Sequence, residues 1–204
     1  MTTDLVAQFG QIDIYLFDQI IKGRISDRGT ILDAGCGHGR NLEYFLRSGF
    51  NVLAVDWDSD AVAAVIRMAA DLAPQLPAEN FRVESVEAMS FADGVADVVV
   101  CNAVLHFARD DAAFDAMVRG SWQVLRNGGL FFARLASSIG MEGRVTPLDG
   151  RRHCLPDGTV RYLVDEPLLR RYGRTLGGIL VEPLKTTVVQ DQRCMTTWVL
   201  RKGV

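Results

Sequence analysis

The segment ILDAGCGHGR at residues 31–40 constrains the fold more than any other part of the 204-residue sequence. An apolar run ends at Asp33, Gly35, Gly37 and Gly39 follow, and RNLEYFLRSG then reads as a helix ending near residue 49. Glycine permits a positive φ and a close approach of the backbone to a ligand, and a helix start offers free N–H donors. The segment therefore predicts a strand–loop–helix unit for a nucleotide-like cofactor; a turn that uses glycine only for packing is the alternative.

Apolar runs alternate with amphipathic stretches along the rest of the chain, which is the pattern of a parallel sheet covered by helices. We expect strands at 30–34, 51–55, 81–84, 96–102 and 129–136, and helices at 11–23, 60–72, 111–125 and 165–175. Segments 177–189 and 193–201 read as two further strands that can pair antiparallel, with Met195 and Trp198 in the core. The predicted class is α/β, with residues 1–204 in a single domain.

The composition suits a globular domain with a buried core, because 49% of the residues are hydrophobic and 23% are charged. The cysteines lie far apart and lack zinc-ligand spacing, so we expect reduced thiols and no metal site; they are Cys36, Cys101, Cys154 and Cys194. A formal charge of -3 gives no strong nucleic-acid signal and favours a small-molecule partner.

No segment is predicted to direct the chain to a membrane. The N-terminus has no Lys or Arg before Lys22, and Asp13 and Asp18 interrupt its apolar residues, unlike a signal peptide. The apolar run at 95–108 is short and contains Asp97 and His106, so it is not expected to span a bilayer. A cytoplasmic location is the expectation.

The glycine spacing separates two classes of cofactor. The dinucleotide fingerprint GxGxxG needs a third glycine at position 40, where this chain has Arg40, and the pattern is GxGxG instead. That form, after an acidic strand end, resembles the first motif of the class I S-adenosylmethionine-dependent methyltransferases. The order of further motifs over residues 30–135 resembles the same family.

The resemblance implies a three-layer Rossmann-like sandwich with a mostly parallel seven-stranded sheet whose last strand is antiparallel. It implies S-adenosylmethionine as the cofactor and S-adenosylhomocysteine as the product. Gly35, Cys36 and Gly37 would face the methionine part, and Asp33 would help to hold its amino group. GHGRNLEYFLRSGFNVLAVD is similar to the tellurite-resistance-type branch of small-molecule methyltransferases, where the residue at Arg40 would meet the cofactor carboxylate.

The adenosine part has its own candidate residues. Asp56 lies twenty-three residues after Asp33, close to the interval at which an acidic residue meets ribose hydroxyls, and the Trp57 indole can stack on adenine. A helix-start charge and simple packing are the alternative roles of these two residues. Segment 83–107 resembles the third and fourth family motifs, which assigns Ser85 and Val86 to adenine and Asn102 to the methionine end. Family members often have Asp at position 85, so Glu84 or Glu87 could substitute for it, or both could be simply solvated.

Two residues are candidates for catalysis. His106 follows the fourth strand and could act as a base, although a packed, hydrogen-bonded histidine is the alternative. Tyr15 belongs to an N-terminal helical segment, residues 1–28, that would close over the cofactor as in relatives; a core contact is the alternative.

The basic stretch at 137–164 could form a lid over an anionic acceptor or a solvated loop; it contains Arg144, Arg151, Arg152, His153 and Arg161. The predicted function is methyl transfer to a small-molecule acceptor, in a possible homodimer. The alternatives are an NAD-dependent oxidoreductase and a catalytically silent S-adenosylmethionine-binding module.

Overall fold

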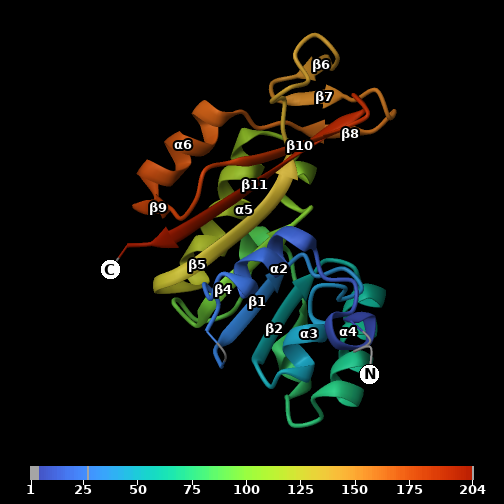
Figure 1. Cartoon of the computed structure of the whole chain (residues 1–204), viewed down its shortest axis with the longest axis vertical. Helices are drawn as coiled ribbons and strands as arrows, with labels where there is room; N and C mark the ends of the chain where they lie inside the picture. Colours follow the sequence, from blue (N-terminus) through green and yellow to red (C-terminus); the bar gives the residue numbers. More distant parts are fainter. Residues whose placement is uncertain (1–4, 27, 204) are drawn as a thin grey trace.

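The computed structural model describes residues 5–26 and 28–203 (Figure 1). The helices are α1 (Leu5–Phe9), α2 (Ile14–Ile21), α3 (Glu43–Arg47), α4 (Ser59–Leu72), α5 (Asp111–Val124) and α6 (Glu166–Thr175), with short 3-10 turns η1 (Ala78–Asn80), η2 (Val86–Ala88) and η3 (Leu105–Phe107). The main-sheet strands are β1 (Thr30–Ala34), β2 (Asn51–Asp56), β3 (Phe81–Val83), β4 (Ala96–Asn102), β5 (Leu125–Ala136), β9 (Gly178–Leu180), β10 (Lys185–Val189) and β11 (Arg193–Lys202).

The main sheet has the strand order β10-β11-β5-β4-β1-β2-β3, and β9 pairs with β11 beside this path. Strands β1 to β5 run parallel, whereas β11 is antiparallel to β5, β9 and β10. The predicted fold class and the antiparallel last strand are confirmed, and the short strand β9 adds to the seven on the path. Because chain order reverses between β1 and β4, a crevice is expected at the carboxyl ends of these strands.

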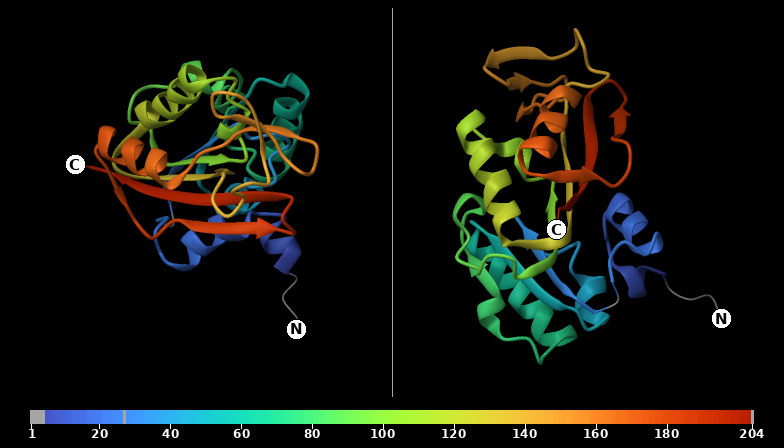
Figure 2. Two further views of the ribbon diagram at one scale, coloured as in Figure 1. Left: turned by 90° about the horizontal axis from the view of Figure 1, so that it is seen from above. Right: turned by 90° about the vertical axis from the view of Figure 1, so that its left-hand side faces the viewer.

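Two apolar cores, one on each face of the sheet, create the three layers. Consecutive residues Val98, Val99 and Val100 of β4 are all buried because both faces are covered, as in other parallel sheets. One core packs against α2, α3 and α4, and the other packs against α5 and α6. The left view of Figure 2 shows α5 above the sheet and the N-terminal helices below it.

Aspartate side chains fix the starts of three helices close to the predicted positions. Asp58, Asp110 and Asp165 each accept a hydrogen bond from a backbone N–H in the first turn of α4, α5 and α6. Such N-caps satisfy donors that have no partner inside the helix. The predicted helices at 60–72, 111–125 and 165–175 are therefore confirmed to within one residue at each end.

Several predicted boundaries differ from the structure. The helix expected at 11–23 is shorter, because Asp13 caps α2 at Ile14 and the helix ends at Ile21. The strand expected at 129–136 begins earlier, because Leu125 of β5 already pairs with Ala96 and the register then shifts between Ala96 and Val98. Segment 177–189 is not one strand, since Pro183 lies in the break between β9 and β10. Proline cannot donate a ladder hydrogen bond, which favours a break there.

The sequence suggested a loop at residues 137–164, but the structure has regular strands there. Strands β6 (Thr146–Asp149), β7 (Arg152–Cys154) and β8 (Val160–Tyr162) form a small antiparallel sheet, at the top of Figure 1. Buried Tyr162 stacks on Phe114 with ring centroids 4.8 Å apart, and its hydroxyl donates to Asp111 over 2.7 Å. We call these three strands the cap sheet; its contacts with α5 hold it against the main domain.

No helix in the described part of the chain combines the length and the apolar character that crossing a bilayer requires.

Candidate active site

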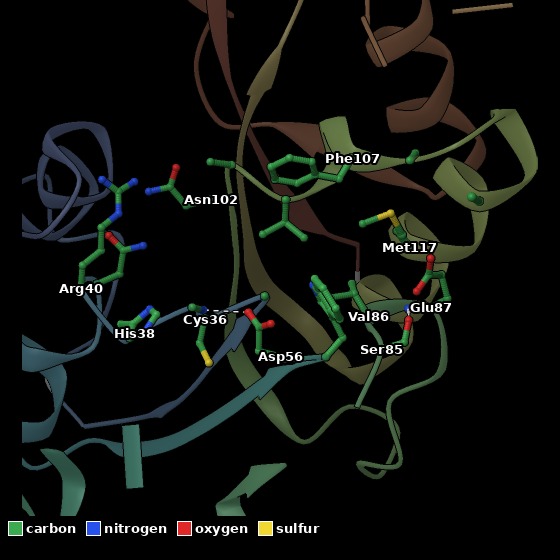
Figure 3. Close-up of a pocket in the computed structure, with 18 of the residues that line it drawn as sticks. Cys36, His38, Arg40, Asp56, Ser85, Val86, Glu87, Asn102, Phe107 and Met117 are labelled. Carbon is green, nitrogen blue, oxygen red and sulfur yellow. Dashed lines mark hydrogen bonds between the residues drawn. The ribbon is translucent and has the colours of Figure 1, made fainter. Parts of the chain in front are cut away.

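A cavity of about 810 Å³ opens at the carboxyl ends of β1, β2 and β4, where the strand order reverses. Every residue that the sequence assigned to the cofactor lines this cavity, with the exception of Asp33. Figure 3 shows Arg40 and Asn102 on one side, Ser85 and Glu87 on the opposite side, and Asp56 between them. The cavity therefore joins residues from four separate segments of the sequence.

Two glycines of the loop, Gly35 and Gly37, have different surroundings. At Gly35, with φ of 84°, an added Cβ would collide with the Val104 side chain. At Gly37, with φ of 50°, an added Cβ would meet no atom within 4 Å. Since Gly37 lines the cavity and has no Cβ, a ligand in the cavity can contact its backbone directly.

Asp56, at the end of β2, is tied to this loop. Its Oδ2 accepts from the backbone N–H of Gly37 over 2.8 Å, and its Oδ1 accepts from the N–H of Asp58 over 3.0 Å. Each carboxylate oxygen can accept a second hydrogen bond. The buried carboxylate is therefore positioned by the backbone and retains acceptor capacity for a vicinal diol in the cavity.

Buried polar groups without partners lie at the methionine end proposed from the sequence. Asp33 is 1% exposed, and neither of its carboxylate oxygens has a hydrogen-bond partner among the described residues. Burial raises its pKa to about 8, against the opposing effect of the positive charge of Arg40. The amide of Asn102, 7% exposed, likewise has no described partner. The unpartnered carboxylate of Asp33 suits an ammonium group, and Arg40 with the amide of Asn102 suits a carboxylate. Since S-adenosylmethionine carries both groups, these residues fit it.

The opposite end of the cavity suits an adenine ring. Trp57 lines the cavity and is 83% exposed, so a face of its indole ring is accessible for stacking on an adenine ring. Ser85 caps η2 by accepting from the N–H of Glu87 over 3.4 Å, and Val86 lines the wall beside it. Of the two carboxylates considered as substitutes at this end, Glu87 lines the cavity, whereas Glu84 accepts from the N–H of Ser90 over 2.8 Å.

His106 lies behind the cavity wall, not on it. It is buried, and its Nδ1 accepts from the backbone N–H of Ala136 over 3.1 Å. Burial lowers its pKa to about 4, and the charges of Arg161 and Arg134 act in the same direction. A neutral imidazole whose Nδ1 accepts carries its proton on Nε2, so neither nitrogen is free to act as a base. This geometry supports the packed role that the sequence left open.

Tyr15 also lies outside the cavity lining. Its hydroxyl hydrogen-bonds to the Thr187 hydroxyl over 2.6 Å, and its ring lies 5.1 Å from the guanidinium of Arg134. The N-terminal segment reaches the site at another point, where the N–H of Asp13 donates to Asn41 over 3.0 Å and Asn41 lines the cavity. Closure of residues 1–28 over a cofactor stays a prediction, and residues 1–4 and 27 lie outside the described part.

Several lining residues were missed by the sequence reasoning. Ala113 and Met117 lie four residues apart on α5 and line the cavity, but that spacing is equally typical of a core face. Phe107 also lines it and is 62% exposed. Ala103 takes a positive φ of 63° directly after β4, a conformation that is uncommon outside glycine and often marks functional sites. Only the position of Ala103 and Phe107 after a parallel strand could have indicated them.

Comparison with known proteins agrees with this site. Residues 32–133, half of the chain, match the model of the methyltransferase domain family. The chain belongs to the methyltransferase domain family. The predicted family and its cofactor class, S-adenosylmethionine, are confirmed by this match and by the similarities below. The tellurite-resistance-type branch stays a prediction.

A protein of Mycobacterium tuberculosis, described as a probable S-adenosylmethionine-dependent methyltransferase, is 30% identical over 135 residues. The aligned region covers 64% of this chain and 46% of that protein, so the chain spans about half the length of such relatives. A ubiquinone biosynthesis O-methyltransferase of Methylocella silvestris is 34% identical over 103 residues, which cover 50% of this chain and 38% of that protein.

Among solved structures, the chain resembles the 1,6-didemethyltoxoflavin-N1-methyltransferase of Burkholderia thailandensis, which was crystallised with bound 1,6-didemethyltoxoflavin and S-adenosylhomocysteine. The TM-score is 0.71 at 19% identity, and the match covers 98% of this chain and 82% of that one. At this identity the likeness concerns the fold, and it supports the Rossmann-like architecture.

Proposed function

We propose that this domain transfers the methyl group of S-adenosylmethionine to a small-molecule acceptor. The observation that carries the proposal is the cavity at the switch point of the sheet, where the unpartnered amide of Asn102 and an open glycine loop line the wall and the unpartnered carboxylate of Asp33 lies buried just before that loop. The relatives named above, which include enzymes acting on small molecules, support the acceptor class.

Each residue has a defined part in holding the cofactor. Asp33 would accept from the ammonium group, Arg40 and Asn102 would bind the carboxylate, and Asp56 would accept from the ribose hydroxyls. Trp57 would cover adenine beside Ser85 and Val86. Bound S-adenosylmethionine supplies a methyl sulfonium that is already electrophilic, so the protein needs mainly to orient an acceptor and exclude water.

The proposed mechanism assigns no base to the protein. His106 has no free basic nitrogen, and the hydroxyl of Tyr15 is bonded to Thr187, away from the cavity lining. The acceptor would therefore bring its own nucleophilic lone pair to the methyl group. Without a histidine base, the acceptor atom must already be deprotonated or must lose its proton to water.

Calorimetry with S-adenosylhomocysteine tests the proposal. Wild-type protein should bind it at submillimolar concentration, and Asp33→Ala and Asp56→Ala should each weaken binding, whereas Asp149→Asn on the exposed cap sheet should not. Failure of the wild type to bind either S-adenosylmethionine or its product would refute the proposal. A larger rise in melting temperature with a nicotinamide dinucleotide would favour an oxidoreductase instead. Binding without turnover on any acceptor would leave the silent binding module as the function.

A further inference from the structure

The part of the cavity around Phe107 is lined mainly by apolar side chains. Phe107 of η3 lies there, at the top of Figure 3, and its ring is 62% exposed. Val104, Ala108 and Met117 line the wall with it, and all three are apolar. We call these four residues the apolar rim. A rim of this kind fits the hydrocarbon part of an acceptor, not a polar or highly hydrated molecule.

Arg161 of the cap sheet contacts Phe107 of the rim, although it is not itself among the residues that line the cavity. Its guanidinium carbon is 4.8 Å from the centroid of the Phe107 ring. Its Nη1 donates to the carbonyl of Val160, and within the described residues it forms no ion pair. A guanidinium has five N–H donors, so most of its donors and its full charge remain available.

Asp157 is the carboxylate whose charge interacts with Arg161, but it accepts hydrogen bonds from Thr159 and forms its ion pair with Arg193, over 3.9 Å. The carboxylates that line the cavity are Asp56 and Glu87; in Figure 3 both lie below Phe107, and Glu87 lies next to Met117, at the adenosine side of the rim. Arg109, which also lines the cavity, adds a second positive charge, although Asp110 lies 3.6 Å from it. His106, next to Phe107, is neutral because burial keeps its pKa low. Among the described residues, Arg161 is thus the arginine beside Phe107 that has no carboxylate within 4 Å.

We propose that the methyl acceptor is a small organic anion whose apolar part packs on the rim and whose negative group binds Arg161. This inference rests on the proposed function and adds the substrate class to it. A guanidinium beside an aromatic ring binds a carboxylate or phosphate through paired hydrogen bonds. A lone pair of the acceptor attacks the methyl carbon, the carbon–sulfur bond breaks, and its electron pair stays on the sulfur of S-adenosylhomocysteine. Any proton on the attacking atom passes to water, since no base of the protein is assigned.

The cap sheet offers a matched control. Arg161 faces His153 across the β7–β8 ladder, whereas Arg152 faces Tyr162. Since neighbouring residues of a strand point to opposite faces, Arg152 and Arg161 lie on opposite faces of the cap sheet. Arg161→Gln and Arg152→Gln therefore remove the same charge from the same small sheet, but only the first removes it from the rim.

The experiment compares matched probes on the protein loaded with S-adenosylhomocysteine. Benzoate, 4-hydroxybenzoate, hexanoate and phenyl phosphate are titrated beside benzamide, 4-hydroxybenzamide, hexanamide and phenol, with wild type, Arg161→Gln and Arg152→Gln. Binding of S-adenosylhomocysteine by each variant reports whether the fold and the cofactor cavity are intact. Loss of a charged hydrogen bond should weaken the bound anions by about tenfold or more in Arg161→Gln. Arg152→Gln should bind them like the wild type.

Other outcomes separate the two proposals. If S-adenosylhomocysteine does not bind to the wild type, the proposed function itself fails. If it binds but no anion of the panel binds, or if the neutral partners bind as tightly, the acceptor is not an anion. Equal losses in Arg161→Gln and Arg152→Gln would also overturn the inference, since a general decrease in positive charge would then explain them.

Discussion

Asp56 Oδ2 accepts a hydrogen bond from the backbone N–H of Gly37 over 2.8 Å, which joins the end of β2 to the glycine loop after β1. One carboxylate thus shapes the loop and faces the cavity. Asp56→Asn keeps the size of the side chain but replaces one acceptor oxygen with a donor group. Affinity for S-adenosylhomocysteine should fall by about tenfold or more, measured by calorimetry. Asp58→Asn, at the N-cap of α4 outside the cavity lining, should leave it unchanged.

Trp57→Ala should weaken cofactor binding and leave the free energy of unfolding nearly unchanged. Because the indole is 83% exposed, its removal should change the free energy of unfolding by less than about 0.5 kcal/mol. Loss of stacking on adenine should cost roughly 1–3 kcal/mol of cofactor affinity. Ile179→Ala, at another exposed apolar residue outside the cavity lining, should change neither quantity. A marked loss of stability in Trp57→Ala would show that the ring packs in the fold instead.

Asp33→Asn should stabilise the protein and weaken cofactor binding. Burial raises the pKa of Asp33 from 3.8 to about 8, so between these pH values the folded state holds a proton that the unfolded state releases. Stability from this group is therefore present at low pH and decreases as pH rises towards about 8. The asparagine variant should have the higher melting temperature at pH 8.

The same carboxylate should make binding depend on pH. An ammonium group favours ionised Asp33, so affinity for S-adenosylhomocysteine should rise with pH up to about 8, and this rise should be absent in Asp33→Asn. Titrations at several pH values measure it. An unchanged pH dependence in the variant would place the ammonium group away from Asp33.

His106→Asn tests the packed role of this histidine. The pKa of His106 is lowered from 6.5 to about 4, so the stability it contributes is present above pH 6.5 and is lost as pH falls to about 4. Asparagine can still accept from the N–H of Ala136, whereas alanine leaves that donor unpaired at a cost of about 1–3 kcal/mol. Denaturant unfolding should rank wild type and His106→Asn above His106→Ala. Equal stability of the two variants would contradict a hydrogen-bonding role.

Glu182→Gln should loosen the contact between α2 and the segment that leads to β10. The carboxylate of Glu182 lies within 2.9 Å of both Lys22 and Arg24 and 3.2 Å from Lys185. Burial opposes its ionisation, but hydrogen bonds from these cations and Gln19 outweigh burial and lower its pKa to about 2. Its contribution is present above pH 4.5 and is lost as pH falls to about 2.

Denaturant unfolding at pH 7 should show a loss of roughly 1–3 kcal/mol in Glu182→Gln, because one charged acceptor is removed from several donors. Glu166→Gln removes an exposed carboxylate whose partner, Arg170, lies one turn along the same helix, and it should cost less than about 0.5 kcal/mol. Similar effects of the two variants would mean that the ion pairs of Glu182 add no more stability than a surface pair.

The sequence by itself determined the features that depend on local chemistry. Glycine spacing, strand periodicity and aspartate caps depend on neighbouring residues, so the loop at 31–40, the main strands and most helix boundaries were predictable. Asp56 and Asn102 could be placed in the site because parallel strands bring their carboxyl ends to one edge.

The tertiary structure alone decided the features that depend on distant contacts. His106 is held by Ala136, thirty residues away, and its burial makes it neutral. The stretch at 137–164 forms strands because Tyr162 packs on Phe114 of α5, a contact with no local pattern. The position of Arg161 beside Phe107 follows from that packing. Burial sets the charge of His106, and long-range contacts set the position of Arg161. Neither depends on the residues next to them in the sequence, so no short segment could predict them.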